Sequence, residues 1–196
     1  MKFLFLFIIF LIQGCFSTPK IQADDICEVL DEKVSWFQSV DQSEKKWDVD
    51  KSLILAFIHQ ESRFESNALP PKDSFFGLFR SSSAYGFAQV KEKTWEWYQV
   101  KTNHHNAKRN EFSDVVDFIG WYVNKSSQRL KINNNDVVKQ YLAYHEGQGG
   151  YEQKTYQQKP WLIRVAKKVK RRADLYKKQL KTCEAQLSKN TPWSFF

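Results

Sequence analysis

The sequence predicts a mostly α-helical protein built as a single domain. Apolar residues recur at spacings of three and four along the chain, as in helices with one buried face, and no segment alternates with the period of two typical of a strand. Behind an apolar N-terminal segment about 180 residues remain, enough for one domain with a substantial core. Neither a repeat nor a low-complexity tract divides them.

Capping residues, prolines and glycines set the expected limits of the helices. Residues 67–83 contain too much proline, glycine and serine for a long helix. The last helix follows Pro160; its apolar residues recur every three or four positions and its other face is strongly basic, which predicts a long amphipathic helix docked by one face. The expected helices are 25–40, a segment that starts after Asp48 or Asp50 and carries Glu61, 90–98, 114–127, 136–144 up to a break at Gly147, and the segment from 160 onward.

The first fifteen residues have the features of an export signal. Lys2 supplies the positive start, and Phe3 to Ile12 is an apolar run too short to span a membrane. The run ends in Ile-Gln-Gly-Cys15, which resembles the lipobox of bacterial lipoproteins, where cleavage precedes a cysteine that carries lipid. We therefore expect a signal peptide over 1–14, a lipid on Cys15, a tether over 15–24 and a folded domain over 25–190. Plain secretion with loss of Cys15 is the alternative.

Two cysteines remain near the ends of the mature chain, Cys27 and Cys183. In an exported protein such a pair most simply forms a disulfide; two unpaired buried thiols are the alternative. The sequence has no Cys-x-x-Cys pair and no His/Cys cluster with metal-ligand spacing, so no metal site is expected.

The formal net charge is +8, and much of the excess lies in the last helix. A basic helix face is usually just solvated, although attraction to the anionic cell wall or to lipid head groups is a functional alternative. Nucleic-acid binding would suit the charge but not the export signal, so no nucleic-acid partner is expected.

Glu61 is the leading candidate for chemistry. It follows an apolar helical stretch and lies four residues after Phe57 and three after Ile58, on the side of the buried face. Burial against hydrocarbon raises the pKa of a carboxyl. A carboxylic acid still protonated near neutral pH is what a general acid for glycosidic cleavage requires. The alternative is an ordinary solvated glutamate at a helix boundary.

Three short segments occur in order: Gln60-Glu61-Ser62-Arg63-Phe64, Ser83-Ala-Tyr-Gly-Phe-Ala-Gln89 and Leu142-Ala-Tyr-His-Glu-Gly147. Together they resemble the catalytic domain of soluble-type lytic transglycosylases, a lysozyme-like fold that cleaves bacterial peptidoglycan. With the lipobox, the resemblance is to a lipoprotein member. That family carries Glu-Ser at a helix end, then Gly-Leu-Met-Gln, then Ala-Tyr-Asn-x-Gly. The resemblance covers about residues 48–155.

The resemblance implies a role for each matched position. Glu61 takes the place of the single catalytic acid/base, Gln89 lines the sugar groove, and Tyr144 bonds and orients the catalytic carboxyl. Substrate contacts are also expected from Ser62 of the Glu-Ser pair, from Ser82 near the position of a groove serine, and from His145, which replaces the usual Asn.

The implied reaction cleaves the β-1,4 bond between MurNAc and GlcNAc and closes a 1,6-anhydroMurNAc ring without a cofactor or metal. A hydrolytic glycosidase instead needs two carboxylates. Glu65, Asp73 and Glu146 are the candidates for a second one, and Glu146 is the strongest because its motif borders the expected groove. A hydrolytic muramidase of goose-type lysozyme character therefore stays an alternative, as does a non-catalytic peptidoglycan-binding component of an envelope assembly.

The expected partners are peptidoglycan glycan strands, a membrane through the N-terminal lipid, and an envelope or secretion-machine complex, since such machines often include wall-remodelling proteins. The expected location is the periplasm. Phe16 follows Cys15 where inner-membrane lipoproteins carry aspartate, which favours anchoring in the outer membrane.

Overall fold

The computed structural model describes residues 24–72 and 82–190, and there it consists of seven α-helices and a short 3-10 helix, without a β-strand. This confirms the mostly α fold class. The expected signal peptide, Cys15 and Asp73 lie outside the described residues. The helices are α1 (Ile26–Glu32), α2 (Val34–Trp47), α3 (Lys51–Ser62), α4 (Glu92–Thr102), α5 (Phe112–Leu130), α6 (Val137–Glu152), η1 (Thr155–Gln158) and α7 (Pro160–Asn190).

The segment expected as one helix over 25–40 is two helices, so that prediction was wrong. The chain leaves helical geometry at Lys33 (φ −124°, ψ 66°), and α2 then continues to Trp47. The break separates two packing partners: α1 lies mainly on α7, whereas α2 lies mainly on α5. A single straight helix could not pack against both α7 and α5.

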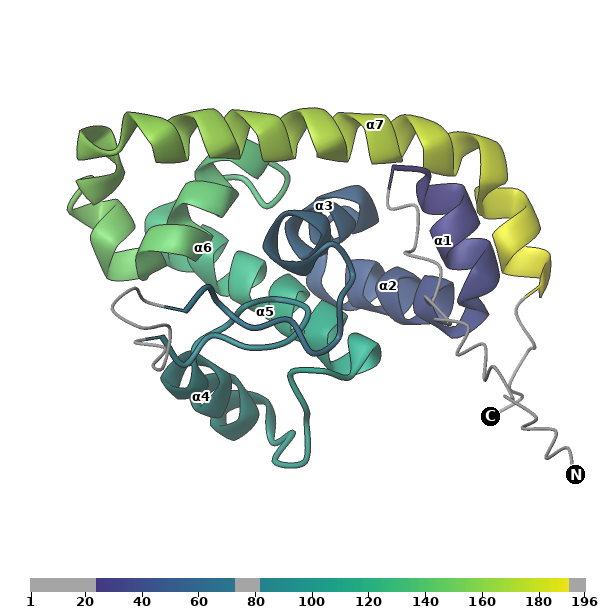
Figure 1. Cartoon of the computed structure of the whole chain (residues 1–196), viewed down its shortest axis with the longest axis horizontal. Helices are drawn as coiled ribbons and strands as arrows, with labels where there is room; N and C mark the ends of the chain where they lie inside the picture. The colour runs from purple at the N-terminus through teal and green to yellow at the C-terminus, as the bar shows by residue number, and fades with distance from the viewer. Residues whose placement is uncertain (1–23, 73–81, 191–196) are drawn as a thin grey trace, which may run out of the picture.

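Helix α3 runs through the middle of the molecule, between α7 on one side and α2 and α5 on the other (Figure 1). Asp50 is its N-cap and accepts a hydrogen bond from the backbone N–H of Ser52 at 2.9 Å. Every residue from Lys51 to Ile58 is buried. The helix ends at Ser62, and its C-cap Arg63, two residues after Glu61, has a left-handed backbone.

Helix α7 lies along one edge of the molecule, over α3 and α6 (Figure 1). This confirms the long C-terminal amphipathic helix. Across residues 24–72 and 82–190, no helix combines the length and apolarity needed to cross a bilayer. The buried residues of α7 recur every three, four or seven positions: Leu162, Ala166, Val169, Ala173, Tyr176, Leu180 and Leu187.

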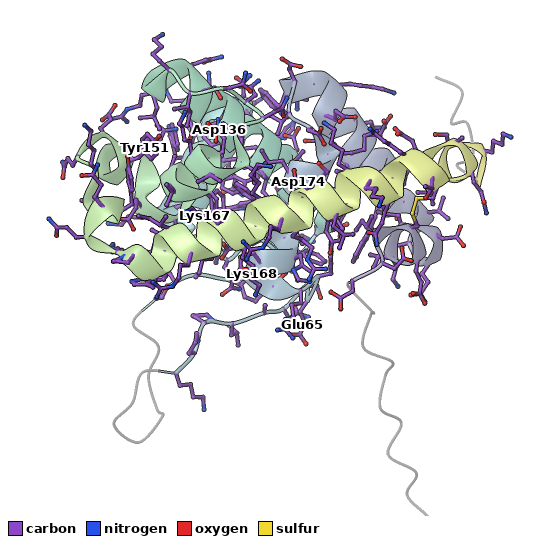
Figure 2. The ribbon with its side chains drawn as sticks, turned by 90° about the horizontal axis from the view of Figure 1, so that it is seen from above. Glu65, Asp136, Tyr151, Lys167, Lys168 and Asp174 are labelled. Atoms are coloured by element: carbon purple, nitrogen blue, oxygen red, sulfur yellow. A yellow bond between two sulfur atoms is a disulfide. The ribbon has the colours of Figure 1, made fainter. Side chains whose placement is uncertain are left out.

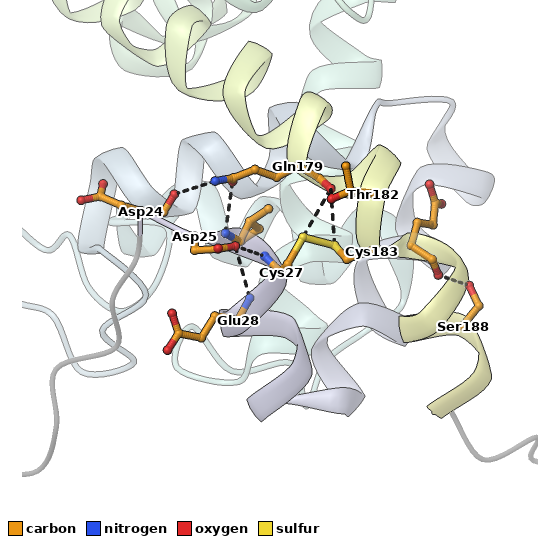
Figure 3. The surroundings of a disulfide bond; sticks show 10 residues. Asp24, Asp25, Cys27, Glu28, Gln179, Thr182, Cys183 and Ser188 are labelled. Atoms are coloured by element: carbon orange, nitrogen blue, oxygen red, sulfur yellow. Dashed lines mark hydrogen bonds between the residues drawn. A yellow bond between two sulfur atoms is a disulfide. The ribbon is translucent and has the colours of Figure 1, made fainter.

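Cys27 of α1 and Cys183 of α7 form a disulfide, as the sequence predicts (Figure 3). The contacts around it join the same two ends of the chain. The side chain of Gln179 accepts a hydrogen bond from the backbone N–H of Ile26 at 3.2 Å and donates one to the carbonyl oxygen of Asp24 at 3.1 Å. The N-terminal helix is thus held to the last helix by a covalent bond and by polar contacts.

We expect the Cys27→Ser/Cys183→Ser double variant to fold with a free energy of unfolding lower by up to about 5 kcal/mol, because the bridge closes a loop with a sequence separation of 156 residues. Urea unfolding measures the change. Dithiothreitol should lower wild-type stability to that of the variant and leave the variant unchanged. Equal stability of the oxidised wild type and the variant would contradict a stabilising bridge.

Candidate active site

A cavity of about 560 Å³ lies at the C-terminal end of α3. Its walls come from α3, α4, α5 and α6 and from the connecting segments before α4. The three sequence motifs therefore converge on one cavity, although 77 residues lie between the end of the first and the start of the last. The lining residues are Glu61, Pro70, Pro71, Ala84, Gln89, Val90, Lys91, Thr94, Phe118, Tyr122, Tyr144, His145, Glu146 and Gly147.

Glu61 occupies the last turn of α3 and lines this cavity. Its surroundings are otherwise closed, and burial raises the pKa of its carboxyl to about 7, with a hydrogen bond from the Tyr141 hydroxyl acting in the opposite direction. That hydroxyl donates to Glu61 Oε1 at 2.8 Å. The negative end of the helix dipole at this position adds a further cost to ionising the carboxyl. Glu61 can therefore hold a proton near neutral pH.

The tyrosine that bonds Glu61 is Tyr141, not Tyr144, so the role expected for Tyr144 is corrected. Tyr144 points its hydroxyl to the carbonyl oxygen of Ala88 at 2.6 Å. Both rings pack edge-on against Phe57, with centroids 5.2 and 5.3 Å away. The two tyrosines lie one turn apart on α6 and face the same way. Only Tyr141 lies close enough to reach Oε1 of Glu61. Tyr144 lines the cavity and links α6 to the second motif through Ala88.

Gln89 lines the cavity, as expected, but its amide nitrogen is already engaged. Nε2 donates to the carbonyl oxygens of Ala68 at 2.8 Å and of Gly86 at 3.0 Å. The turn that carries it depends on Gly86, whose φ of +76° is left-handed and whose added Cβ would lie 2.0 Å from the carbonyl oxygen of Arg109. Gly86 thus serves a close backbone approach to Arg109 rather than to the groove.

The two expected serines do not line the cavity. The hydroxyl of Ser62 is buried and donates to the carbonyl oxygen of Ile58 at 3.2 Å, within α3. Ser82 accepts a hydrogen bond from the backbone N–H of Ala84 at 3.2 Å. Both hydroxyls therefore support local backbone structure in the part of the chain described.

Glu146 borders the cavity but is tied to its neighbours. Its side chain is 4% exposed and accepts hydrogen bonds from Lys159 Nζ at 2.8 and 2.9 Å, from the Thr155 hydroxyl and from His145 Nδ1 at 3.1 Å. Burial alone would raise the pKa of this carboxyl, but the hydrogen bonds, led by that from Lys159, outweigh it and lower the pKa to about 2. His145 lines the cavity beside it, as expected.

Of the other two candidate carboxylates, Glu65 is exposed on the surface (Figure 2), and Asp73 lies outside the described residues. Within residues 24–72 and 82–190, no group of three or more His, Cys, Asp or Glu side chains is arranged to hold a metal ion. Glu61 and Glu146 are thus the two carboxyls of the described lining, and their environments push their pKa values apart.

Sequence reasoning missed Tyr141 and the aromatic wall formed by Phe118 and Tyr122. A signal for Tyr141 was present, since it lies one helical turn before Tyr144 on the same face. The aromatic wall had no local signal, because both residues belong to the ordinary apolar stripe of α5.

Comparison with known proteins agrees with this geometry. The sequence matches the family described as Transglycosylase SLT domain over residues 3–183, which is most of the chain. Neither curated proteins nor solved structures gave a significant match. The chain therefore belongs to the transglycosylase SLT domain family, which supports a lytic-transglycosylase-like function acting on peptidoglycan.

Proposed function

We propose that this protein is a peptidoglycan lytic transglycosylase that cleaves the MurNAc–GlcNAc β-1,4 bond with Glu61 as its single acid/base. The observation that carries the proposal is a buried carboxyl with a pKa of about 7 at the floor of a large cavity, in a member of this family. General acid catalysis is most effective when the pKa of the acid lies near the working pH.

The reaction needs one carboxyl that first donates a proton and then accepts a different one. Tyr141 donates to Oε1 of Glu61, which leaves Oε2 to carry the proton to the glycosidic oxygen. The C1–O bond then breaks, GlcNAc leaves as an alcohol, and the muramic acetamido group stabilises the positive charge at C1. The Glu61 carboxylate takes the proton of the C6 hydroxyl, and O6 bonds to C1 to close the 1,6-anhydro ring. No water is consumed.

The state of Glu146 supports one carboxylate rather than two. A hydrolase would need a nucleophile or a base to activate water. Both oxygens of Glu146 accept hydrogen bonds from the Lys159 ammonium, and its pKa of about 2 makes it a weak base. We propose that this carboxylate instead holds the wall of the groove.

Substrate contacts are proposed for Gln89, Tyr144 and His145, which all line the cavity. Ser62 and Ser82 would act indirectly, by holding the backbone on either side of it. The exposed Lys91 suits the acidic groups of peptidoglycan, whereas Phe118 and Tyr122 are buried and shape the apolar wall from behind.

Export and anchoring rest on the sequence. We propose that residues 1–14 are removed, that Cys15 carries lipid, and that residues 15–24 connect the lipid to the folded domain over 25–190. The protein would then act from the periplasmic face of the outer membrane. A wall-remodelling role inside an envelope or secretion complex is compatible with this location.

The direct test is mass spectrometry of the products released from purified peptidoglycan sacculi. We expect muropeptides that end in 1,6-anhydroMurNAc. Glu61→Gln should fold and lose roughly 10²-fold to 10⁴-fold or more in rate, because a carboxamide cannot donate the proton. Glu65→Gln, an exposed change on the same segment, is the matched control and should keep its rate. Wild-type turnover by Glu61→Gln would overturn the assignment of the acid.

Glu146→Gln separates the one-carboxylate mechanism from hydrolysis. We expect anhydro products to persist, with a rate loss of less than about tenfold, because the amide still fills the site but pairs less well with Lys159. Product masses and initial rates measure both. Reducing ends in the wild type, one water heavier, together with their loss in Glu146→Gln, would instead identify a muramidase.

The stability of Glu61→Gln relative to wild type should depend on pH. Below pH 4.5, the pKa of an unperturbed glutamic acid, folded and unfolded chains both keep the proton. Between pH 4.5 and about 7 only the folded chain keeps it, so wild-type stability falls as pH rises, and above pH 7 the full penalty is present. The variant should therefore gain on the order of 3 kcal/mol over wild type between pH 4 and pH 8 in urea unfolding. A pH-independent difference would contradict the raised pKa.

A further inference from the structure

A row of unpaired basic side chains lies on the outer face of α7. The row consists of Arg164, Lys167, Lys168, Arg171 and Lys178, all exposed, and we call it the basic stripe. Spacings of three, four and seven place these residues on one side of the helix, opposite the buried residues of α7. Figure 2 looks onto this side and shows Lys167 and Lys168 on it.

The basic stripe lacks carboxylate partners among the described residues. The acidic side chains nearby are used elsewhere: Asp174 pairs with Lys170 at 2.7 Å, and Asp50 pairs with Lys177. Like charges three and four residues apart on a helix destabilise it. Arg164, Lys167, Lys168 and Arg171 stand at such spacings, so their mutual repulsion opposes the folding of α7 unless something anionic neutralises them.

The shape of the stripe suits a flat surface. The distance from Arg164 to Lys178 along the helix axis is about 21 Å, and α7 follows one edge of the molecule before it bends near its C-terminal end (Figure 1). Leu175 lies inside the stripe, between Arg171 and Lys178, and is 41% exposed. An apolar side chain flanked by cations is typical of a helix that rests on lipid head groups.

The position of the chain's N-terminal end also points to lipid. The first described residue, Asp24, bonds to α7 through Arg172 at 2.6 Å and through Gln179. Eight residues lie between it and Cys15, so nine residue steps give a reach of at most about 30 Å. A lipid on Cys15 would therefore keep α7 close to the bilayer. No described residue of α7 lines the cavity, so this contact leaves the cavity free.

We propose that the basic stripe binds the anionic lipid head groups of a bilayer and that α7 is the membrane-facing side of the protein. The proposal does not depend on the role of Glu61, and Glu61→Gln is expected to bind vesicles like wild type. An N-terminal lipid alone would leave the orientation of the folded domain open. Binding through the basic stripe fixes it, with α7 on the membrane and the cavity away from α7.

The test compares binding of the mature protein to phosphatidylcholine vesicles and to vesicles that also contain phosphatidylglycerol. An N-terminal lipid contributes equally to both, so the ratio of the two partition coefficients isolates the charge effect. Each basic side chain near an anionic surface contributes roughly fivefold. We expect the Lys167, Lys168, Arg171 and Lys178→Gln variant to lose about 10²-fold or more of the anionic preference.

The matched control neutralises four exposed lysines away from α7, namely Lys93, Lys101, Lys108 and Lys131. The control variant should lose less than about fivefold of the preference for anionic vesicles. Circular dichroism and urea midpoints should show that both variants fold. Equal losses in the two variants would mean that net charge alone acts and would overturn the proposal. Equal binding of the wild type to both kinds of vesicle would also overturn the proposal. A stripe variant that binds anionic vesicles normally but no longer binds sacculi would overturn it too, and would identify the cell wall as the partner.

Discussion

The burial of α3 is the constraint on which the rest of the structure depends. An eight-residue stretch without exposure on any side can be stable only when other helices surround it, and α2, α5 and α7 do so. The enclosure becomes partial in the last turn, where Glu61 is half-buried and lines the cavity, but its carboxyl is still shielded enough for its pKa to rise. The free energy that folds the domain and the pKa shift that suits Glu61 for acid catalysis therefore have one origin, the exclusion of water from α3.

Lys51 and Glu61, at opposite ends of α3, show how neighbouring groups decide the effect of burial on a pKa. Lys51, in the first turn, meets Asp41, Glu44 and Glu184 within 2.9 Å. Burial would lower the pKa of this lysine, but the three carboxylates raise it, so the ammonium stays charged and links α2, α3 and α7. Among the described residues no cation pairs with Glu61, so burial raises the pKa of its carboxyl to about 7 even though the hydrogen bond from Tyr141 acts in the opposite direction. The presence or absence of opposite charges nearby therefore decides whether a shielded ionisable group in α3 stays charged, as Lys51 does, or can stay neutral, as Glu61 can.

Local patterns in the sequence were enough to predict most of the helices, the long amphipathic α7, the disulfide and the inward position of Glu61, because each depends on periodicity or on a residue count, but they missed the division of α1 from α2 at Lys33. They could not distinguish Tyr141 from Tyr144, since two residues one turn apart share a face and only the height of α6 relative to α3 decides. Local patterns also could not predict that Lys159 pairs with Glu146. Lys159 reaches it only because the chain turns back after α6.

That return begins at Gly147, whose backbone (φ 74°, ψ 158°) lies in a region open essentially to glycine alone. Its added Cβ would meet nothing within 4 Å, so conformation and not space requires glycine. The kink leaves His145 on the cavity and lets Thr155 and Lys159 close over Glu146. This wall is made by contacts within fifteen residues of sequence, whereas the raised pKa of Glu61 depends on burial by distant segments. Changes in the wall can therefore alter the shape of the cavity without changing the environment that raises the pKa of Glu61.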